Sequence, residues 1–460
     1  MSSETLLPTF RDPQGSLRLE GDSAIRTLHP ARREAALEFV ASAFSLRLQL
    51  HGDMIGTIVE EEGASGLRLV HPRVAVPSYP WEWTPSQWLA AAELTLRLCA
   101  EALDEGWILK DATPLNILFV GARPVLVDVL SFEKREPGVA IWLAYGQYVR
   151  TFLLPLLMNK MQSWPLSLSL FRRDGFEPSE LAAALSWRQR LSPAAFWPIT
   201  LPAWLERRKG ADTKQPAKRT MAPDAATHVL KGTLKSLRKR TERAMSKVTR
   251  SEWSEYQTTL THYTAEESAA KQAWVTQALE EAQPRRVLDV GANTGEYSAL
   301  AASLGAEVVA LERDGAAADR LFRMSRDRGL NVLTLHADLA RPTPAAGWEN
   351  AEQGSLLARL EGQFEMVMLL AVIHHLILME QIPLEKILAL CARLTKKHLI
   401  VEWVPVSDPM YQSLMRGRDE LYGALTEADL LTAAAAYFRV VRQQTLGNGR
   451  ILFLMELLPG

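Results

Sequence analysis

Residues 287–295, Val-Leu-Asp-Val-Gly-Ala-Asn-Thr-Gly, constrain the fold more than any other part of the chain. A β-type apolar run ends in an acid, and two glycines four positions apart follow it. The next residues predict a helix over 296–304 and a second strand over 307–311 that ends at Glu312. This order is typical of the first half of a Rossmann-type βαβ unit, whose glycines let the backbone turn sharply beside a ligand.

The same stretch limits which nucleoside it can bind. A dinucleotide needs Gly-x-Gly-x-x-Gly, whereas Asn293 and Glu296 stand at the second and third glycine positions. Because a carboxylate repels phosphate, the pattern favours a ligand without phosphates, and S-adenosylmethionine fits. Its ammonium would pair with Asp289, its carboxylate with backbone N–H groups of the turn, and its ribose with Glu312. The alternative is an ordinary tight strand-to-helix turn.

Length and composition indicate the number of domains and the class of protein. A chain of 460 residues predicts two or three domains, and 47% apolar with 23% charged residues is typical of a soluble globular protein. Cys99 and Cys391 stand in unlike helical contexts, which predicts reduced thiols and a cytoplasmic protein. The N-terminus lacks the basic start and apolar core of a signal peptide. We expect no transmembrane segment, because the longest apolar run, 367–379, contains His374 and His375 and is too short.

A net charge of −1 conceals a basic block over 207–250, with 14 Lys/Arg against 3 Asp/Glu. The block predicts a linker with a helix over 206–250, between domains 1–205 and 251–460. Residues 230–248 follow the pattern of a basic amphipathic helix, which can bind polyanions or a membrane surface. The alternative is a solvated face of an interdomain helix. We expect a small-molecule substrate and no specific nucleic-acid partner.

The N-terminal domain is predicted to be α+β. Its expected strands are 16–19, 24–28, 54–60 and 67–70, and its first expected helix is 31–43. Thr84-Pro85 is a helix-start signal for a helix that runs to about Glu105.

Residues 107–119 contain Asp111 and, five positions later, Asn116. A hairpin follows, and its second predicted strand, 125–129, carries Asp128. This order resembles the catalytic and metal loops of protein kinases and aminoglycoside phosphotransferases. The resemblance implies that Asp111 accepts a hydroxyl proton and that Asn116 and Asp128 bind magnesium beside a nucleotide. The alternative is an Asp-capped turn that leads into a plain hairpin.

This domain departs from the kinase pattern in the groups that hold ATP. No glycine-rich phosphate loop is visible, and Arg26 is the candidate for the phosphate-binding cation. Lys110 precedes Asp111, and Asp128-Val129-Leu130 replaces Asp-Phe-Gly. The sequence therefore predicts a kinase-like fold that is catalytically degenerate.

The C-terminal half continues the Rossmann pattern. Predicted strands over 331–335, 364–370 and 399–404 and a closing hairpin over 437–457 resemble the sheet of class I methyltransferases. The resemblance implies that Asp338 accepts from the adenine amino group and that Leu339 packs on the ring. It also places the helix 266–279 over the cofactor. The predicted cofactor-binding residues are Asp289, Gly291, Asn293, Gly295, Glu312, Asp338, Leu339, Leu370, Tyr263 and Lys271, with Tyr256 also expected on the covering segment.

His374 and His375 follow the fourth predicted strand, whose tip faces the transferred methyl group in methyltransferases. A neutral imidazole there can take a proton from a hydroxyl or an amine. Consecutive residues entering a helix point about 100° apart, so one of the two is expected to face the substrate. We predict that it is His374. The alternative is a helix-start histidine that holds a backbone group.

A narrower resemblance extends over nearly the whole chain. The chain resembles a bacterial group of nodulation-associated, NoeA-like methyltransferases in a series of short segments: 109–116, Tyr263 with Lys271, 288–295, 347–348, 374–376 and 402–405. This resemblance implies methyl transfer from S-adenosylmethionine to a hydroxyl or amine, with a carbohydrate-containing substrate as one expectation. Two alternatives remain open: a bifunctional phosphotransferase-methyltransferase, and a non-catalytic, ligand-gated interaction module.

Overall fold

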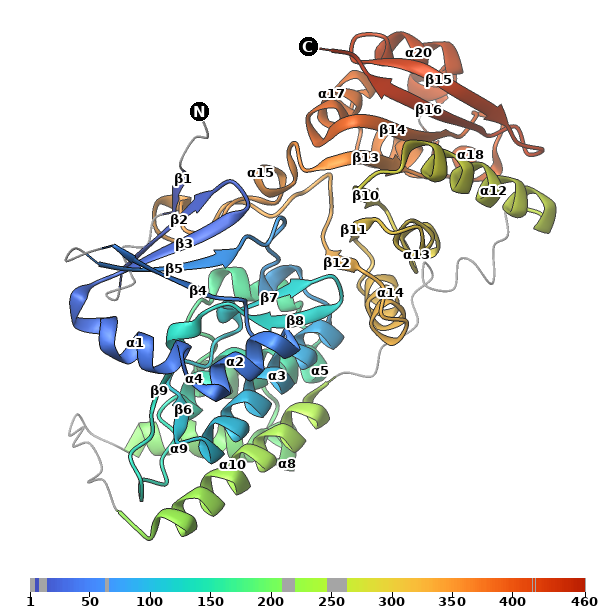
Figure 1. Cartoon of the computed structure of the whole chain (residues 1–460). Coiled ribbons are helices and arrows are strands. Elements are labelled where there is room, and N and C mark those ends of the chain that lie inside the picture. Colours follow the sequence, from blue (N-terminus) through green and yellow to red (C-terminus); the bar gives the residue numbers. More distant parts are fainter. Residues whose placement is uncertain are drawn as a thin grey trace. The chain divides into compact units, whose positions relative to one another are not determined.

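The computed structural model describes residues 5–7, 15–62, 66–208, 220–245, 263–415, 417 and 419–459. Two compact units make up the chain: Met1–Phe119 with Pro124–Lys247, and Val120–Arg123 with Val248–Gly460. The first, unit 1, is α+β, and the second, unit 2, is an α/β domain with a mostly parallel sheet (Figure 1).

Unit 1 begins with an antiparallel sheet of five strands in the order β1-β2-β3-β5-β4. The strands are β1 (Thr5–Leu7), β2 (Gly15–Glu20), β3 (Ser23–Leu28), β4 (Ile58–Glu62) and β5 (Gly66–Pro72). Alternate residues of β5, Leu67 and Leu69, are fully buried, as expected for a sheet that covers a core with one face. The strands predicted over 16–19, 24–28 and 67–70 are thus present.

Two expectations for this region were wrong. The helix expected over 31–43 is two helices, α1 (Arg33–Val40) and α2 (Ala43–His51), after a 3-10 turn at Pro30–Arg32. The Ser42 hydroxyl accepts from the Ser45 N–H and so starts α2 as an N-cap. The spacing of apolar residues, from which one long helix was predicted, does not reveal this cap. Because α2 extends to His51, the strand expected from residue 54 starts only at Ile58.

Helix α3 (Pro85–Asp104) forms the centre of the helical part of unit 1. Thr84 and Gln87 cap it reciprocally, as the Thr-Pro signal predicts, and Trp88 is fully buried within its inner face. Helix α10 (Pro223–Ala244) packs on α3 and on α5 (Leu154–Gln162). The basic helix expected over 230–248 therefore starts earlier and belongs to unit 1; residues 246–248 lie outside the described residues.

Short elements complete unit 1. Two-stranded pairs join β6 (Trp107–Leu109) to β9 (Phe132–Lys134) and β7 (Ile117–Val120) to β8 (Arg123–Leu126). The remaining helical segments are η3 (Pro80–Glu82), η4 (Pro114–Asn116), η5 (Val129–Ser131), α4 (Tyr145–Tyr148), η6 (Val149–Leu153), η7 (Leu166–Phe171), α6 (Pro178–Ala184), α7 (Trp187–Leu191), α8 (Pro193–Ala195), η8 (Phe196–Thr200) and α9 (Leu201–Arg208).

Unit 2 is built on a seven-stranded sheet in the order β12-β11-β10-β13-β14-β16-β15. Strands β10 to β14 run parallel, and β16 pairs antiparallel with both β14 and β15. The strands are β10 (Arg286–Val290), β11 (Glu307–Glu312), β12 (Val332–His336), β13 (Phe364–Leu369), β14 (Thr395–Trp403), β15 (Phe438–Thr445) and β16 (Ile451–Leu457). Every predicted strand of this unit is present, within a few residues at each end.

Helices cover both faces of this sheet, with α12, α13 and α14 on one face and α17 and α20 on the other (Figure 1). The helices are α12 (Ala265–Ala282), α13 (Glu296–Ser303), α14 (Gly315–Asp327), η10 (Trp348–Asn350), α15 (Leu356–Leu360), α16 (Ile373–Leu378), α17 (Leu384–Leu394), α18 (Pro409–Met415), α19 (Asp419–Tyr422) and α20 (Glu427–Ala434). The carboxyl ends of β10 to β13 therefore meet at one edge, where ligands bind in open parallel sheets.

Candidate active site

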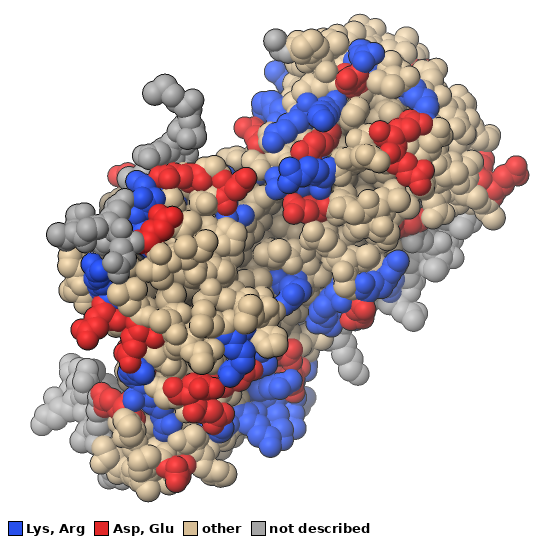
Figure 2. Space-filling view, viewed as in Figure 1, with Lys and Arg blue, Asp and Glu red and all other residues tan. Residues whose placement is uncertain are grey.

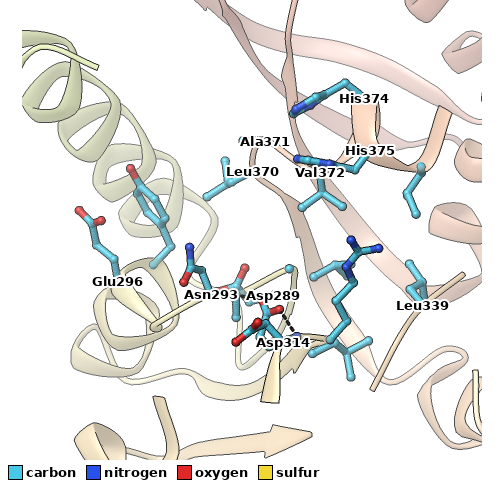
Figure 3. A pocket seen from close by; sticks show the side chains of 18 of the residues that line it. Asp289, Asn293, Glu296, Asp314, Leu339, Leu370, Ala371, Val372, His374 and His375 are labelled. Atoms are coloured by element: carbon cyan, nitrogen blue, oxygen red, sulfur yellow. Dashed lines mark hydrogen bonds between the residues drawn. The ribbon is translucent and has the colours of Figure 1, made fainter. Parts of the chain in front are cut away.

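A cavity of about 580 Å³ lies at this carboxyl edge of unit 2. Figure 3 shows Asp289 and Asn293 on one side of it, with Val372, His374 and His375 across from them. All predicted cofactor-binding and catalytic residues of unit 2 line the cavity except Gly295, the N-cap of α13; the lining residues are Tyr263, Lys271, Asp289, Gly291, Asn293, Glu312, Asp338, Leu339, Leu370, His374 and His375. Tyr256 lies outside the described residues.

The turn after β10 depends on its two glycines. Gly291 has a φ of 70°, and a Cβ there would lie 2.5 Å from a methyl group of Val372. Gly295 has a φ of 91°, and a Cβ there would lie 2.0 Å from Leu321. Both positions need glycine for backbone conformation and for space. Gly295 thus shapes the cavity indirectly, by letting α13 start close to α14.

Asp289, the second-last residue of β10, has a buried carboxylate. Its Oδ2 accepts a 2.6 Å hydrogen bond from the Ser298 hydroxyl on α13. Burial raises the pKa of Asp289 to about 6, although Ser298 and the charge of Lys271 oppose the rise. A buried carboxylate that lines a cavity and is held in an unfavourable charged state is suited to receive a cation from a ligand.

Glu312 ends the neighbouring strand, β11, and fixes the loop around it. One carboxylate oxygen accepts from the Asn293 N–H and the other from the Asp314 N–H, both at 2.7 Å. Burial raises the pKa of Glu312 above its ordinary value. Each oxygen keeps lone-pair capacity for a hydroxyl donor such as a ribose diol. Among the described residues, the buried side-chain oxygen of Asn293 has no hydrogen-bond partner, which leaves an acceptor for a ligand.

The third predicted acid, Asp338, follows β12. Its Oδ1 accepts from the Ala340 N–H at 2.9 Å, and its Oδ2 lies 3.2 Å from the Arg341 guanidinium. Leu339 and Leu370 are buried, and Leu370 directly follows β13. The next residue, Ala371, has a φ of 57°, a conformation rarely adopted by residues other than glycine, so the tip of β13 is held under strain beside the cavity.

The paired histidines begin α16 at this strained tip, and their ring centroids lie 4.3 Å apart. Both residues line the cavity, and which of them faces the substrate stays a prediction. Residues 370–372 separate β13 from α16, and the two histidines lie in the first turn of that helix. His374 is the more buried of the two. Burial, with Arg313 and Arg450 adding to it, lowers the pKa of His375 to about 4, so its imidazole is neutral at neutral pH.

A buried charge network stands beside the cavity. Glu402, in β14 and fully buried, accepts from the Lys271 ammonium at 2.6 Å and from the Arg450 guanidinium at 3.2 Å. The Tyr263 hydroxyl donates to Glu402 and accepts from Arg450 at 2.8 Å. Arg450 also donates to Asp408 at 2.8 Å. The network therefore ties the start of α12 to β14 and to the start of β16.

The electrostatics of this network keep Tyr263 neutral. Burial and the nearby Glu402 charge raise the pKa of the Tyr263 phenol. Burial by itself would raise the pKa of Glu402 as well, but Lys271 and Arg450 outweigh it and lower that pKa. The sequence indicated Tyr263 and Lys271 but assigned no role to Glu402, Asp408 or Arg450. An acid inside an otherwise apolar strand, residues 399–404, was the available signal for Glu402.

In unit 1, the structure brings together part of the predicted kinase-like set. The Asn116 amide donates to the Ser131 hydroxyl at 3.0 Å, and that hydroxyl donates to Asp128 at 2.7 Å. Arg26 of β3 lies 3.2 Å from the same carboxylate. Asp128 is not on the strand where it was predicted, because β8 ends at Leu126; instead its carboxylate accepts from the Leu130 N–H and caps η5.

Asp111 has a separate partner. Its carboxylate accepts a 2.5 Å hydrogen bond from the Gln147 side chain, whose oxygen in turn accepts from the Ala112 N–H. Across the described parts of the chain, no group of three or more His, Cys, Asp or Glu side chains is placed to hold a metal ion. Cys99 and Cys391 are both free and buried.

Comparisons with known proteins place the chain in a family. It is 30% identical over 467 residues to nodulation protein NoeA of Rhizobium meliloti (strain 1021), and the match covers 97% of this chain and 95% of that protein. It is 33% identical over 95 residues to protein-L-isoaspartate O-methyltransferase of Xylella fastidiosa (strain M12), covering 19% of this chain and 41% of that protein. No family model matches the sequence.

Among solved structures, N-methyltransferase NodS from Bradyrhizobium japonicum WM9 is 12% identical and aligns with a TM-score of 0.32, covering 43% of this chain and 98% of that one. Unit 2 thus combines a Rossmann-like sheet with a 95-residue similarity to part of a protein named as an O-methyltransferase. At 30% identity over nearly its whole length, the chain belongs to the family of nodulation protein NoeA.

Proposed function

We propose that unit 2 transfers a methyl group from S-adenosylmethionine to a hydroxyl or amine of a small molecule, with a carbohydrate-containing acceptor as the first class to test. The observation that carries this proposal is the buried carboxylate of Asp289, with its raised pKa, across the cavity from two histidines (Figure 3). The carboxylate can bind the cationic end of the cofactor. Either histidine can take the proton of the hydroxyl or amine that is methylated.

Three acids would hold the cofactor. Asp289 would pair with its ammonium, Glu312 would accept from its ribose hydroxyls, and Asp338 would accept from its adenine amino group. Gly291 and Asn293 offer the turn after β10 for its carboxylate, while Leu339 and Leu370 supply apolar contact with the nucleoside. Tyr263 and Lys271 would cover it from α12.

The cofactor supplies a methyl group that its sulfonium charge has already activated. The protein then has two tasks: to align the acceptor for in-line displacement, and to accept its proton. His374 is the proposed proton acceptor, with His375 as the rival. Both line the cavity, and the neutral imidazole of His375 is available in the same place.

Calorimetry with S-adenosylmethionine and with NAD tests the cofactor. We expect the methyl donor to bind and NAD to fail, because exposed Glu296 stands at the helix start where a pyrophosphate would sit. NAD binding at comparable affinity would contradict the proposal. Mass spectrometry of small molecules that copurify with the protein, followed by assays with labelled methyl donor, then identifies the acceptor. A protein that binds the donor and methylates no copurifying compound would favour the non-catalytic, ligand-gated alternative.

For unit 1 we propose a kinase-like domain that no longer transfers phosphate. The antiparallel sheet followed by helices and the joined Asn116, Ser131 and Asp128 support the kinase-like part. The degenerate part is supported by two contacts: Arg26 pairs with Asp128, and Gln147 pairs with Asp111. Both carboxylates thus pair with side chains of the protein. In a magnesium-nucleotide site these carboxylates would instead contact the metal ion and the substrate.

Incubation with labelled ATP, magnesium and candidate sugars tests this assignment. We expect no phosphoryl transfer above that of the Asp111→Asn variant. Turnover by the unaltered chain that disappears in both Asp111→Asn and Asp128→Ala would instead establish the bifunctional phosphotransferase-methyltransferase.

A further inference from the structure

Unit 1 exposes tryptophans along a continuous helical run, η8 followed by α9. Trp197 is 55% exposed and Trp204 is 46% exposed. The run begins as a π-helix and continues as an α-helix, and within it both tryptophans are exposed whereas Ile199 and Ala203 are buried. A surface helix normally buries its large apolar side chains and exposes polar ones. Here two of the largest apolar side chains are the exposed ones.

The neighbouring helix α7 repeats this arrangement. Trp187 is 67% exposed and Leu191 is 63% exposed, and α7 contacts η8. Arginines accompany the indoles: the Arg188 guanidinium lies 5.2 Å from the Trp187 ring centre, and the Arg208 guanidinium lies 3.8 Å from the Trp204 ring centre. Residues 187–208 contain four arginines and one acid.

The basic helix α10 adjoins this region at α8 (Pro193–Ala195). Its buried face, with Leu230, Leu234 and Leu237, packs on α3 and α5, and α10 also contacts α8, which leads directly into η8. Lys235 and Lys239 are exposed, and no ion pair joins either of them to another described residue. Figure 2 shows Lys and Arg side chains gathered where Figure 1 draws this helix.

We propose that α7, η8, α9 and α10 form a docking surface for an anionic lipid bilayer. Indole rings favour the boundary between headgroups and acyl chains, and Lys and Arg near that boundary are attracted by anionic headgroups. A soluble polyanion would account for the lysines but not for exposed Trp and Leu side chains. A second copy of this chain would account for the indoles but not for the surplus of positive charge.

The surface is of the kind that rests on a membrane. Among the described helices, none combines the length and apolar character that crossing a bilayer requires. The exposed apolar groups are instead few, large and interleaved with cations, as in interfacial helices. This surface belongs to unit 1, so the proposal stands whether or not the acceptor assigned to unit 2 is correct.

Cosedimentation of the full chain with vesicles tests the proposal. We expect binding to phosphatidylcholine vesicles that contain phosphatidylglycerol, little binding to phosphatidylcholine alone, and weakening by salt. The double variants Trp197→Ser/Trp204→Ser and Lys235→Glu/Lys239→Glu should each reduce binding by about tenfold or more. The matched controls are Trp348→Ser and Lys396→Glu/Lys397→Glu, which alter exposed groups of unit 2 and should leave binding unchanged. Thermal melting of each variant checks that it is folded.

Three outcomes would overturn the proposal. One is equal binding by the unaltered chain and both unit 1 variants, or no vesicle binding at all. Another is binding to heparin that matches vesicle binding and ignores the Trp substitutions, which would identify a soluble polyanion. The third is a concentration-dependent dimer that Trp197→Ser/Trp204→Ser dissociates, which would identify a second copy as the occupant.

Discussion

At the scale of single residues, the buried carboxylate of Asp289 lowers the stability of the protein and is expected to strengthen cofactor binding. Its pKa rises from 3.8 to about 6 on folding, so the folded state binds more protons between these values and loses stability as pH rises through them. Above pH 6 the buried charge costs up to about 3 kcal/mol of folding free energy. The cofactor's ammonium would offset this cost.

We therefore predict opposite effects for Asp289→Asn. Without ligand at pH 7.5 the variant should melt at a higher temperature, and this advantage should shrink as the pH falls from about 6 toward 4. Its affinity for S-adenosylmethionine should fall by about 2 kcal/mol or more, because a charged partner is lost. Thermal melts across pH and calorimetry measure the two effects, with Glu280→Gln, an exposed carboxylate of α12 outside the cavity lining, as the control. A lower melting temperature with unchanged affinity would exclude this role.

The paired histidines make a second residue-scale prediction. His374→Ala should cost about a hundredfold or more in single-turnover rate on cofactor-loaded protein, with cofactor affinity little changed. His375→Ala is its matched comparison, since both rings line the cavity. A near-normal rate for loaded His374→Ala would remove that residue from proton transfer. A rate that declines only as the pH drops through about 4 and is abolished in His375→Ala would assign the proton to His375.

At the scale of elements, Glu402 connects three that are distant in the chain. Lys271 of α12 and Arg450 before β16 both reach its carboxylate within β14. Removing one member of a buried charge group is costly because the others stay buried without compensation. The same contacts hold Tyr263 and Lys271 beside the cofactor cavity, so stability and binding depend on one carboxylate.

Glu402→Gln should accordingly destabilise the protein by about 3–5 kcal/mol and weaken cofactor binding. The double variant Lys271→Met/Glu402→Gln should lose less stability than the two single changes added together. In the double variant neither charge of the pair is left buried without its partner. Chemical denaturation provides the free energies of unfolding. Glu456→Gln, on the exposed side of β16, is the control and should change stability by less than about 0.5 kcal/mol. Additive losses in the double variant would show that the contact is not stabilising.

At the scale of the whole molecule, each unit has its own core and its own candidate site. The predicted cofactor-binding residues all belong to unit 2. We therefore expect a fragment of residues 250–460 to fold alone and to bind S-adenosylmethionine as tightly as the full chain does. Calorimetry and a single cooperative melt measure this. A fragment that folds yet binds much more weakly would mean that residues 1–249 contribute to the cofactor site.

The sequence by itself determined the sheet of unit 2 and the acids at its edge. Apolar strands, glycine turns and strand-end acids are local patterns, and parallel strands bring their carboxyl ends together at one edge. Asp289, Glu312 and Asp338 could therefore be assigned to one cavity before any contact was known. In unit 1 the Thr84-Pro85 signal similarly predicted the start of α3, whereas the Ser42 cap that divides α1 from α2 was missed.

Tertiary structure alone decided the partners of these residues. Glu402 meets Lys271 across 131 positions and Arg450 across 48, separations over which no periodic pattern operates. It decided that Arg26 pairs with Asp128, 102 positions away, and that both histidines reach the cavity. It also decided which face of α10 is buried and that the indoles of η8 and α9 stay exposed. A side chain's neighbours and burial set its charge state and its availability, and these follow from packing between distant segments, which no single stretch of sequence specifies.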